Sequence, residues 1–219
     1  MTETQNNGQP SRLIAIGDIH GCLKELIGLL HRIDPKPDDQ LVFLGDYIDR
    51  GPESSGVVEY LLDLKRDFPR TIYLMGNHER MFLDFLDDID RLTFMINGGT
   101  MTLKSYQEEE KVRIPQHHID FIRNLPLLHE TEDHIFVHAG LKVDVELAQQ
   151  QEQDMLWIRE DFLNRDIDFG KVVVHGHSPV DKPTLTPHRI AIDTGAVYGR
   201  YLTGCDVEKR TFWHYPDPE

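Results

Sequence analysis

Five short clusters of polar residues could together bind metal ions, and each cluster directly follows an apolar run. They contain carboxylate, imidazole and amide groups, which are all ligands of divalent metals. Six such groups would suit two cations that share a bridging carboxylate and lie about 3.5–4 Å apart. The candidates are Asp18 and His20 in Gly17–Gly21, Asp46 in Gly45–Gly51, Asn77 in Gly76–Glu79, His138 in His138–Leu141, and His175 or His177 in His175–Pro179.

Such a metal pair predicts hydrolysis of phosphate esters. Two divalent cations against two aspartates leave a positive site, which favours an anionic phosphate and a water that ionises near neutral pH. Taken singly, each cluster has a simpler interpretation, because Gly-Asp after a strand is usually a turn and a lone His is more often packed or exposed. The conjunction argues against that interpretation, because a fold does not need carboxylates and imidazoles at five strand ends, where unpaired burial is costly.

The elements that must position these clusters are predicted to be parallel strands joined by helices. Runs that are apolar on both faces predict buried strands, and two helical patterns lie between the first three runs. A strand–helix–strand order predicts parallel pairing, and ligands of such sheets bind beyond the carboxyl ends of the strands. The expected strands are Leu13–Ile16, Leu41–Leu44, Thr71–Met75, Ile135–Val137 and Val172–Val174, and the expected helices are Cys22–Ile33 and Val57–Leu64.

Two other parts of the chain have a different character. Residues 81–125 are charged and partly helical in pattern, and we expect a helical insertion over the site. Within it, Asn97–Thr100 is typical of a Gly-rich turn more than of a substrate contact. Arg189 to Tyr215 predicts antiparallel strands that end in a hairpin. With 219 residues and no repeat or linker, residues 1–219 are expected to form one domain.

The motifs GDIHG, GDYIDRG, GNHE, HAGL and GHSP resemble, in this order, the signature of the calcineurin-like metallophosphoesterases. They are most similar to the PPP-type serine/threonine protein phosphatases in their compact bacterial and phage form. The resemblance covers Leu13 to Gly204, and GDYIDRG followed by GNHE at this distance is highly specific. It implies a mixed α/β, four-layer fold in which two central mixed β-sheets are flanked by helices.

The resemblance also implies roles for the matching residues. His177 is chosen over His175 because Gly176–Pro179 aligns with the family's Gly-His-Thr-Pro pattern. A dimetal-bound hydroxide would attack the phosphate directly, and guanidinium groups would bind its oxygens bidentately. The implied metal ligands are Asp18, His20, Asp46 as the bridge, Asn77, His138 and His177, and the implied catalytic residues are His78 as general acid, Asp49 as its orienting partner, and Arg50 and Arg159 as phosphate-binding groups.

Three functions are compatible with these motifs. The resemblance favours a phosphoserine and phosphothreonine protein phosphatase, which could also act on small phosphoesters. The alternative is a nucleotide hydrolase similar to the symmetrical diadenosine tetraphosphate hydrolases. Those enzymes often carry Gln where this chain has His20, which tips the prediction toward a phosphoprotein or phosphopeptide substrate. A phosphate-binding module without catalysis is disfavoured, because every expected ligand, the acid and both arginines are present.

Composition and ligand chemistry limit the partners, the location and the metals. The net charge of -15 disfavours nucleic-acid backbones and anionic membranes as partners. Met1–Ser11 lacks the features of a signal peptide, and no apolar run approaches the ~20 residues of a spanning helix, so a cytoplasmic location is expected. Mixed oxygen and imidazole ligands suit manganese, iron or zinc. The resemblance to bacterial members favours two manganese ions.

Overall fold

The computed structural model describes residues 10–218, so the first nine residues, on which part of the localisation expectation rests, lie outside the described residues. The strands are β1 Leu13–Ile16, β2 Gln40–Phe43, β3 Ile72–Tyr73, β4 Gln107–Glu108, β5 Lys111–Val112, β6 Leu128–Glu130, β7 His134–Val137, β8 Val172–His175, β9 Thr184–Leu185, β10 Arg189–Ala191, β11 Leu202–Asp206 and β12 Thr211–Tyr215. The α-helices are α1 Leu23–Ile33, α2 Ser54–Asp67, α3 Asn77–Leu86, α4 Arg91–Phe94, α5 Thr100–Ser105, α6 Gln116–Arg123, α7 Glu152–Trp157 and α8 Glu160–Leu163, and shorter turns of other helix types are η1 Met95–Gly99, η2 Leu147–Gln149 and η3 Ala196–Tyr198.

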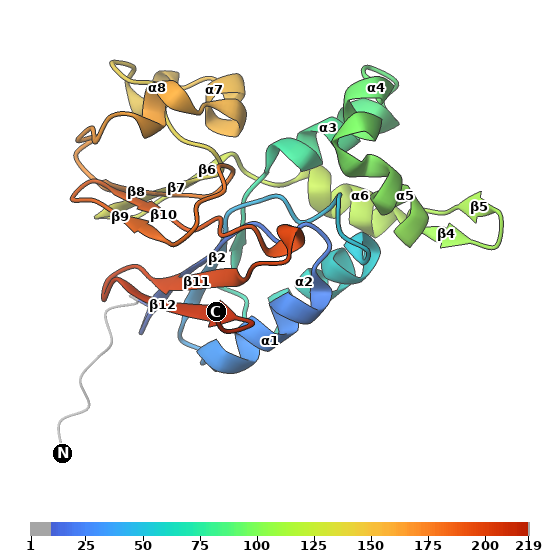
Figure 1. The fold of residues 1–219 in the computed structure, drawn as a ribbon, viewed down its shortest axis with the longest axis horizontal. Coiled ribbons are helices and arrows are strands. Elements are labelled where there is room, and N and C mark those ends of the chain that lie inside the picture. The colour runs from blue at the N-terminus through green and yellow to red at the C-terminus, as the bar shows by residue number, and fades with distance from the viewer. Residues whose placement is uncertain (1–9, 219) are drawn as a thin grey trace.

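Two five-stranded sheets pack against each other, and helices cover their outer faces (Figure 1). The first sheet has the order β12-β11-β1-β2-β3, and the second has the order β6-β7-β8-β10-β9. Helices α1 and α2 lie against the first sheet, while α7 and α8 lie on the far side of the second (Figure 1). This mixed, four-layer arrangement confirms the fold class expected from the motifs.

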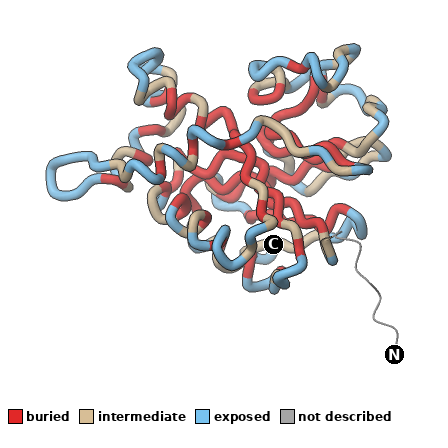
Figure 2. The backbone as a smooth tube through the Cα atoms, turned by 180° about the vertical axis from the view of Figure 1, so that it is seen from behind, coloured by how far each residue is buried: buried red, intermediate tan, exposed pale blue. Residues whose placement is uncertain are grey.

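The apolar strands follow from this layering, because each central strand buries both of its faces. In β1, Ile14 and Ile16 face the helices, whereas Leu13 and Ala15 face the opposite sheet. In β8, Val173 packs toward the outer helices, whereas Val174 lies between the sheets. Alternation with period two therefore distributes one strand between two separate cores. Figure 2 shows that the buried residues are concentrated in the interior of the molecule, and they include nearly all residues of the central strands.

Parallel pairing brings the ends of the central strands to shared edges. β1, β2 and β3 run parallel through the crossovers α1 and α2, with Ile14 opposite Leu41 and Phe43 opposite Tyr73. In the second sheet, β7 and β8 are also parallel, with Ile135 opposite Val173. All five clusters thus follow the carboxyl ends of parallel strands, where ligand sites of open α/β sheets are found.

The C-terminal segment differs from the expectation in one strand. β11 and β12 form the antiparallel hairpin, with Gly204 opposite Trp213, but β10 joins the second sheet, where it runs parallel to β8. Ile190 and Ile192 pack in the core between the sheets. A short apolar alternation fits the inner face of either sheet equally well, so its partner strand is decided by tertiary packing rather than by local pattern.

Residues 81–125 form most of α3, then α4, η1, α5, the exposed β4–β5 hairpin and α6 (Figure 1). Gly98 interrupts the helical geometry with a φ of 103°, where the Asn97–Thr100 turn was expected. That this segment is an insertion within a single domain stays a prediction. Among the described helices, none is long and apolar enough to cross a membrane.

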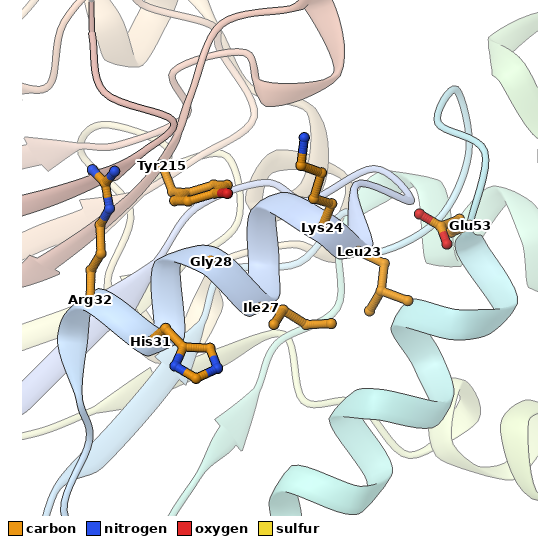
Figure 3. Close-up of a pocket in the computed structure, with 8 residues that line it drawn as sticks. All are labelled: Leu23, Lys24, Ile27, Gly28, His31, Arg32, Glu53 and Tyr215. Atoms are coloured by element: carbon orange, nitrogen blue, oxygen red, sulfur yellow. The ribbon is translucent and has the colours of Figure 1, made fainter.

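A surface groove of about 600 Å³ lies along α1 and contains none of the predicted site residues (Figure 3). One of its lining residues is Gly28, where a Cβ atom would lie 2.5 Å from ring atoms of Tyr215. The absence of a side chain lets this ring lie flat on the helix, and the guanidinium of Arg32 stacks 5.0 Å from the ring centre. The groove therefore belongs to the contact between α1 and β12 rather than to the candidate site.

Candidate dimetal site

Asp46 lies at the centre of the predicted ligands. Its Oδ2 is 3.4 Å from Nε2 of His20, and its Oδ1 is 3.4 Å from Nε2 of His138. Two groups of ligand atoms, His20–Asp46–His78 and Asp46–His138–His177, each lie within 4.8 Å of one another and share this carboxylate. A carboxylate that faces two ligand sets has the arrangement that a bridge between two cations needs.

Two buried imidazoles turn a lone pair toward Asp46. His20 donates from Nδ1 to the carbonyl of Ile48 at 2.9 Å, and His138 donates from Nδ1 to the carbonyl of Leu44 at 2.8 Å. Burial lowers the pKa of His20 to about 3 and also lowers the pKa of His138, so both rings are neutral. With the single proton on Nδ1, each Nε2 is free to act as a metal ligand, which is the usual outer hydrogen bond of a ligating histidine.

The contacts of Asn77 test whether a cation fits. Its Oδ1 lies 2.9 Å from Nε2 of His138 and 2.9 Å from Nδ1 of His177. Because the proton of His138 is on Nδ1, its Nε2 faces Asn77 Oδ1 and Asp46 Oδ1 with acceptors on both sides. Nε2 of His177 is buried without a hydrogen-bond partner in the described part of the chain. Convergent acceptors without protons are stabilised by a cation, so these residues fit a divalent metal.

Asp18 lies beside these ligands but belongs to neither of the two groups that share Asp46. Its carboxylate accepts the backbone N–H of His177 at 3.0 and 3.3 Å, and a Cβ at Gly176 would collide with it. Burial, followed by the charges of Asp193 and Asp46, raises the pKa of Asp18 well above its usual range. Burial likewise raises the pKa of Asp193 to about 6. Three crowded, buried carboxylates again favour a nearby positive charge.

His78 and Asp49 form a buried pair next to these ligands. His78 Nδ1 lies 2.7 Å from Asp49 Oδ2, and the hydroxyl of Thr102 donates to Asp49 Oδ1 at 2.6 Å. The other ring nitrogen, His78 Nε2, is buried without a hydrogen-bond partner among residues 10–218 and lies 4.0 Å from Asp46 Oδ2. A ring oriented by a carboxylate, with its far nitrogen directed at the candidate site, suits a proton donor. The same nitrogen belongs to one of the two ligand groups, so both roles are chemically open.

The two arginines lie at the rim of the site. Arg50 Nη1 donates to His20 Nε2 at 2.7 Å, and its guanidinium lies 5.9 Å from the ring centre of Tyr198. A cation on His20 Nε2 requires Arg50 to give up this hydrogen bond, which frees the guanidinium for an anion. Arg159 donates to Ser178 Oγ at 3.2 Å, directly after His177. Both groups could therefore bind phosphate oxygens.

Backbone strain coincides with the candidate residues. Ten described residues other than glycine have a positive φ, and five of them are predicted site residues. Left-handed conformations cost of order 1–3 kcal/mol each and persist where the surrounding structure enforces them, often at active sites. The five are His20, Asp46, Asp49, Arg50 and His177.

The structure adds residues that sequence reasoning did not assign. Glu79 is fully buried, and its two oxygens accept backbone N–H groups from Asp46 and Tyr47 at 2.8 Å and from Gly76 at 3.0 Å. It thus holds the loop of the candidate bridge, and its place in GNHE was the available signal. His175 packs 5.2 Å from the ring of Phe162 and is not part of either ligand group around Asp46.

Comparison with known proteins identifies the family. The profile of the calcineurin-like phosphoesterases matches residues 11–208. The chain belongs to this family. Calcineurin-like phosphoesterases are hydrolases with a dinuclear centre of divalent metals, and the groups around Asp46 could hold such a pair. The roles of the individual residues stay predictions.

This calcineurin-like phosphoesterase is similar to nucleotide hydrolases and to a protein phosphatase. The asymmetrical bis(5'-nucleosyl)-tetraphosphatase PrpE of Bacillus cereus is 28% identical and aligns with 86% of this chain and 87% of its own. A crystal structure assigned as a diadenosine tetraphosphatase superposes with a TM-score of 0.75 at 24% identity, covering 94% of this chain and 95% of that chain. A serine/threonine phosphatase from Saccharomyces cerevisiae has a TM-score of 0.67 at 15% identity, with 98% and 82% covered. The two structural likenesses establish the fold alone.

Proposed function

We propose that this phosphoesterase hydrolyses dinucleoside polyphosphates such as diadenosine tetraphosphate. The observation that carries the proposal is the likeness to the Bacillus tetraphosphatases, which extends over similar shares of both chains. The motifs alone favoured a phosphoprotein substrate, with a symmetrical diadenosine tetraphosphate hydrolase as the alternative. The named relatives support that alternative better, although their names specify asymmetrical cleavage, which yields a nucleoside triphosphate and a monophosphate.

The residues around Asp46 suit hydrolysis of a phosphoanhydride. Two divalent cations, which we propose to be manganese, would polarise phosphate oxygens and lower the pKa of a water molecule. Arg50 and Arg159 bind oxygens of the attacked phosphate. The attacking water releases a proton to solvent, its oxygen bonds to phosphorus, and the bond to the leaving oxygen breaks. His78, oriented by Asp49, gives the proton on Nε2 to that leaving oxygen.

An exposed aromatic ring beside Arg50 supports a nucleotide substrate. Tyr198 is 60% exposed and lies within cation–π distance of the guanidinium. A phosphate held by Arg50 would bring the attached nucleoside close to this ring, and base stacking on an aromatic side chain contributes about 1–3 kcal/mol. A phosphoserine peptide offers no flat group at this position.

His20 supports a second candidate, hydrolysis of phosphomonoesters on proteins. The symmetrical hydrolases often carry Gln at the matching position, whereas protein phosphatases carry His. This single residue concerns the metal environment and not the substrate, so it carries less weight than the named relatives.

The decisive experiment compares kcat/KM, with Mn²⁺, for diadenosine tetraphosphate, a phosphoserine peptide and 4-nitrophenyl phosphate. We expect clear preference for the dinucleotide, and Tyr198→Ala should lower kcat/KM for it by roughly 5–150-fold while leaving the aryl phosphate unchanged. Preference for the phosphopeptide would overturn the proposal in favour of the second candidate. No metal-dependent turnover of any of the three would indicate a phosphate-binding module.

A further inference from the structure

A second cluster of ligand-type side chains lies outside the candidate dimetal site, where α2 meets α6. Glu59 comes from α2, and His117 and His118 come from the first turn of α6. His118 Nε2 is 2.9 Å from Glu59 Oε2, and His117 Nε2 is 3.5 Å from the same oxygen. The three ligand atoms all lie within 4.8 Å of one another.

The 3.5 Å separation matches the spacing of ligands around a small divalent ion, and the 2.9 Å hydrogen bond would lengthen slightly to reach that spacing. Nitrogen and oxygen ligands at about 2.0–2.2 Å from tetrahedral zinc lie roughly 3.3–3.5 Å apart. Neighbouring residues of a helix point about 100° apart, so two consecutive histidines reach one carboxylate only through particular side-chain rotamers. Here the two rings are edge to face, with centroids 4.5 Å apart and an interplanar angle of 83°. The convergence is therefore a specific arrangement.

The surroundings of His118 prepare it as a ligand. Its side chain is buried, and burial lowers its pKa, so the ring is neutral. The hydroxyl of Tyr106 lies 2.8 Å from His118 Nδ1 and holds the ring with Nε2 toward Glu59. Such an outer hydrogen bond on the remote nitrogen is typical of ligating histidines. Glu59 and His117 are exposed, so an ion and its remaining water ligands can reach the cluster from solvent.

We propose that Glu59, His117 and His118 form a third metal site, for a divalent transition-metal ion such as Zn²⁺, with water completing the coordination. Two imidazoles and one carboxylate suit Zn²⁺, Co²⁺ or Ni²⁺, whereas Mg²⁺ and Ca²⁺ prefer oxygen ligands. The ion would join α6 to α2, the helix whose first residue, Ser54, accepts the backbone N–H of Asp49 at 3.1 Å. Metal binding would thus brace the 81–125 segment against the helix that leads out of the candidate active site.

The test counts bound metal in the full chain. Wild-type protein and the variants His117→Ala and Glu59→Gln are saturated with Zn²⁺ and desalted, and the metal per chain is measured by elemental analysis. Both substitutions alter exposed side chains, so the variants should fold, whereas the buried His118 is left intact. The matched control is His188→Ala, which removes a histidine that pairs with Asp168 at 3.6 Å and belongs to no group of three ligand-type side chains in the described part of the chain.

We expect the wild type and His188→Ala to retain one more zinc ion per chain than either cluster variant. Zinc should also raise the melting temperature of the wild type further than that of the cluster variants, because one more bound ion favours the folded state. Equal zinc content in all four proteins would overturn the proposal. Loss of two ions in His117→Ala would also overturn it, since the substitution would then have disturbed the pair around Asp46.

Discussion

Replacing His78 with alanine should make the rate depend strongly on the leaving group. In the structure, Asp49 holds one ring nitrogen at 2.7 Å, and the other, Nε2, is buried, has no hydrogen-bond partner among the described residues and is directed at the site. A proton donor in this position matters most when the leaving oxygen is strongly basic. General acid catalysis contributes ~10²–10⁴-fold, which corresponds to about 2.7–5.4 kcal/mol of transition-state stabilisation.

The assay uses aryl phosphates that range from phenyl phosphate to 4-nitrophenyl phosphate. For His78→Ala we expect a loss in kcat of ~10²–10⁴-fold with phenyl phosphate and a loss below about tenfold with 4-nitrophenyl phosphate, whose leaving anion needs little help from an acid. Asp49→Asn should show the same trend, because it removes the carboxylate that orients the ring. His129→Ala, at a half-buried histidine bonded to Gln40 at 3.2 Å, should behave as wild type.

Two results would refute this reasoning. If His78→Ala lost the same factor with every aryl phosphate, His78 would not donate the proton. If the variant lost bound metal on elemental analysis, His78 would be a ligand, in keeping with the group it forms with His20 and Asp46.

Three further outcomes are expected. Glu79→Gln places an amide NH₂ group against backbone N–H groups that now donate to the Glu79 carboxylate. The free energy of unfolding measured in urea should therefore fall by about 3–6 kcal/mol. An unchanged midpoint would contradict the role of Glu79 in holding the Asp46 loop. Asp46→Asn should lose both metal ions and Asp18→Asn only one, and equal losses by elemental analysis would argue against a bridge. Burial lowers the pKa of His175 from 6.5 to about 3, so below pH 6.5 the unfolded chain binds a proton that the folded chain does not. Stability should therefore fall as pH drops from 6.5 toward 3, by about 2 kcal/mol at pH 5, and His175→Phe should remove this contribution when unfolding is compared at pH 8 and pH 5.

The positions of the clusters were predictable because local chemistry constrains them. A strand that is apolar on both faces must be central, and the polar residues after it must lie at the edge of the sheet. This reasoning predicted that Asp18, Asp46, Asn77 and His138 lie near one another; in the structure His138 Nε2 lies 3.4 Å from Asp46 Oδ1 and 2.9 Å from Asn77 Oδ1, while Asp18 contacts the backbone of His177. The partner of β10 was not predictable, because three residues of apolar alternation carry no information about which sheet they join.

The residues that hold the candidate site residues in place were harder to predict from the sequence. Thr102 contacts Asp49 across 53 positions of the chain, and an isolated threonine in a helical pattern gives no signal of such a contact. The motifs favoured a phosphoprotein substrate, whereas the named relatives favour a dinucleotide, because the motifs specify ligands for metals and phosphate that protein phosphatases and nucleotide hydrolases share. Selectivity depends on groups that contact the substrate beyond the phosphate, and Tyr198, which we propose as such a group, is not part of the motifs.

Residues 81–125 contact two of the candidate site residues, Asp49 and Arg50, in addition to lying over the site. Thr102 donates to Asp49, the partner of the proposed acid, and the carbonyl of Gly98 accepts the backbone N–H of Arg50 at 3.2 Å. A Cβ at Gly98 would lie 2.8 Å from the backbone nitrogen of Arg50, so only glycine permits this approach. One segment therefore holds both Asp49, the partner of the proposed acid, and the backbone of Arg50, the proposed phosphate-binding arginine. A change in the packing of that segment would alter proton transfer and phosphate binding together, which links its position to catalysis through two adjacent residues.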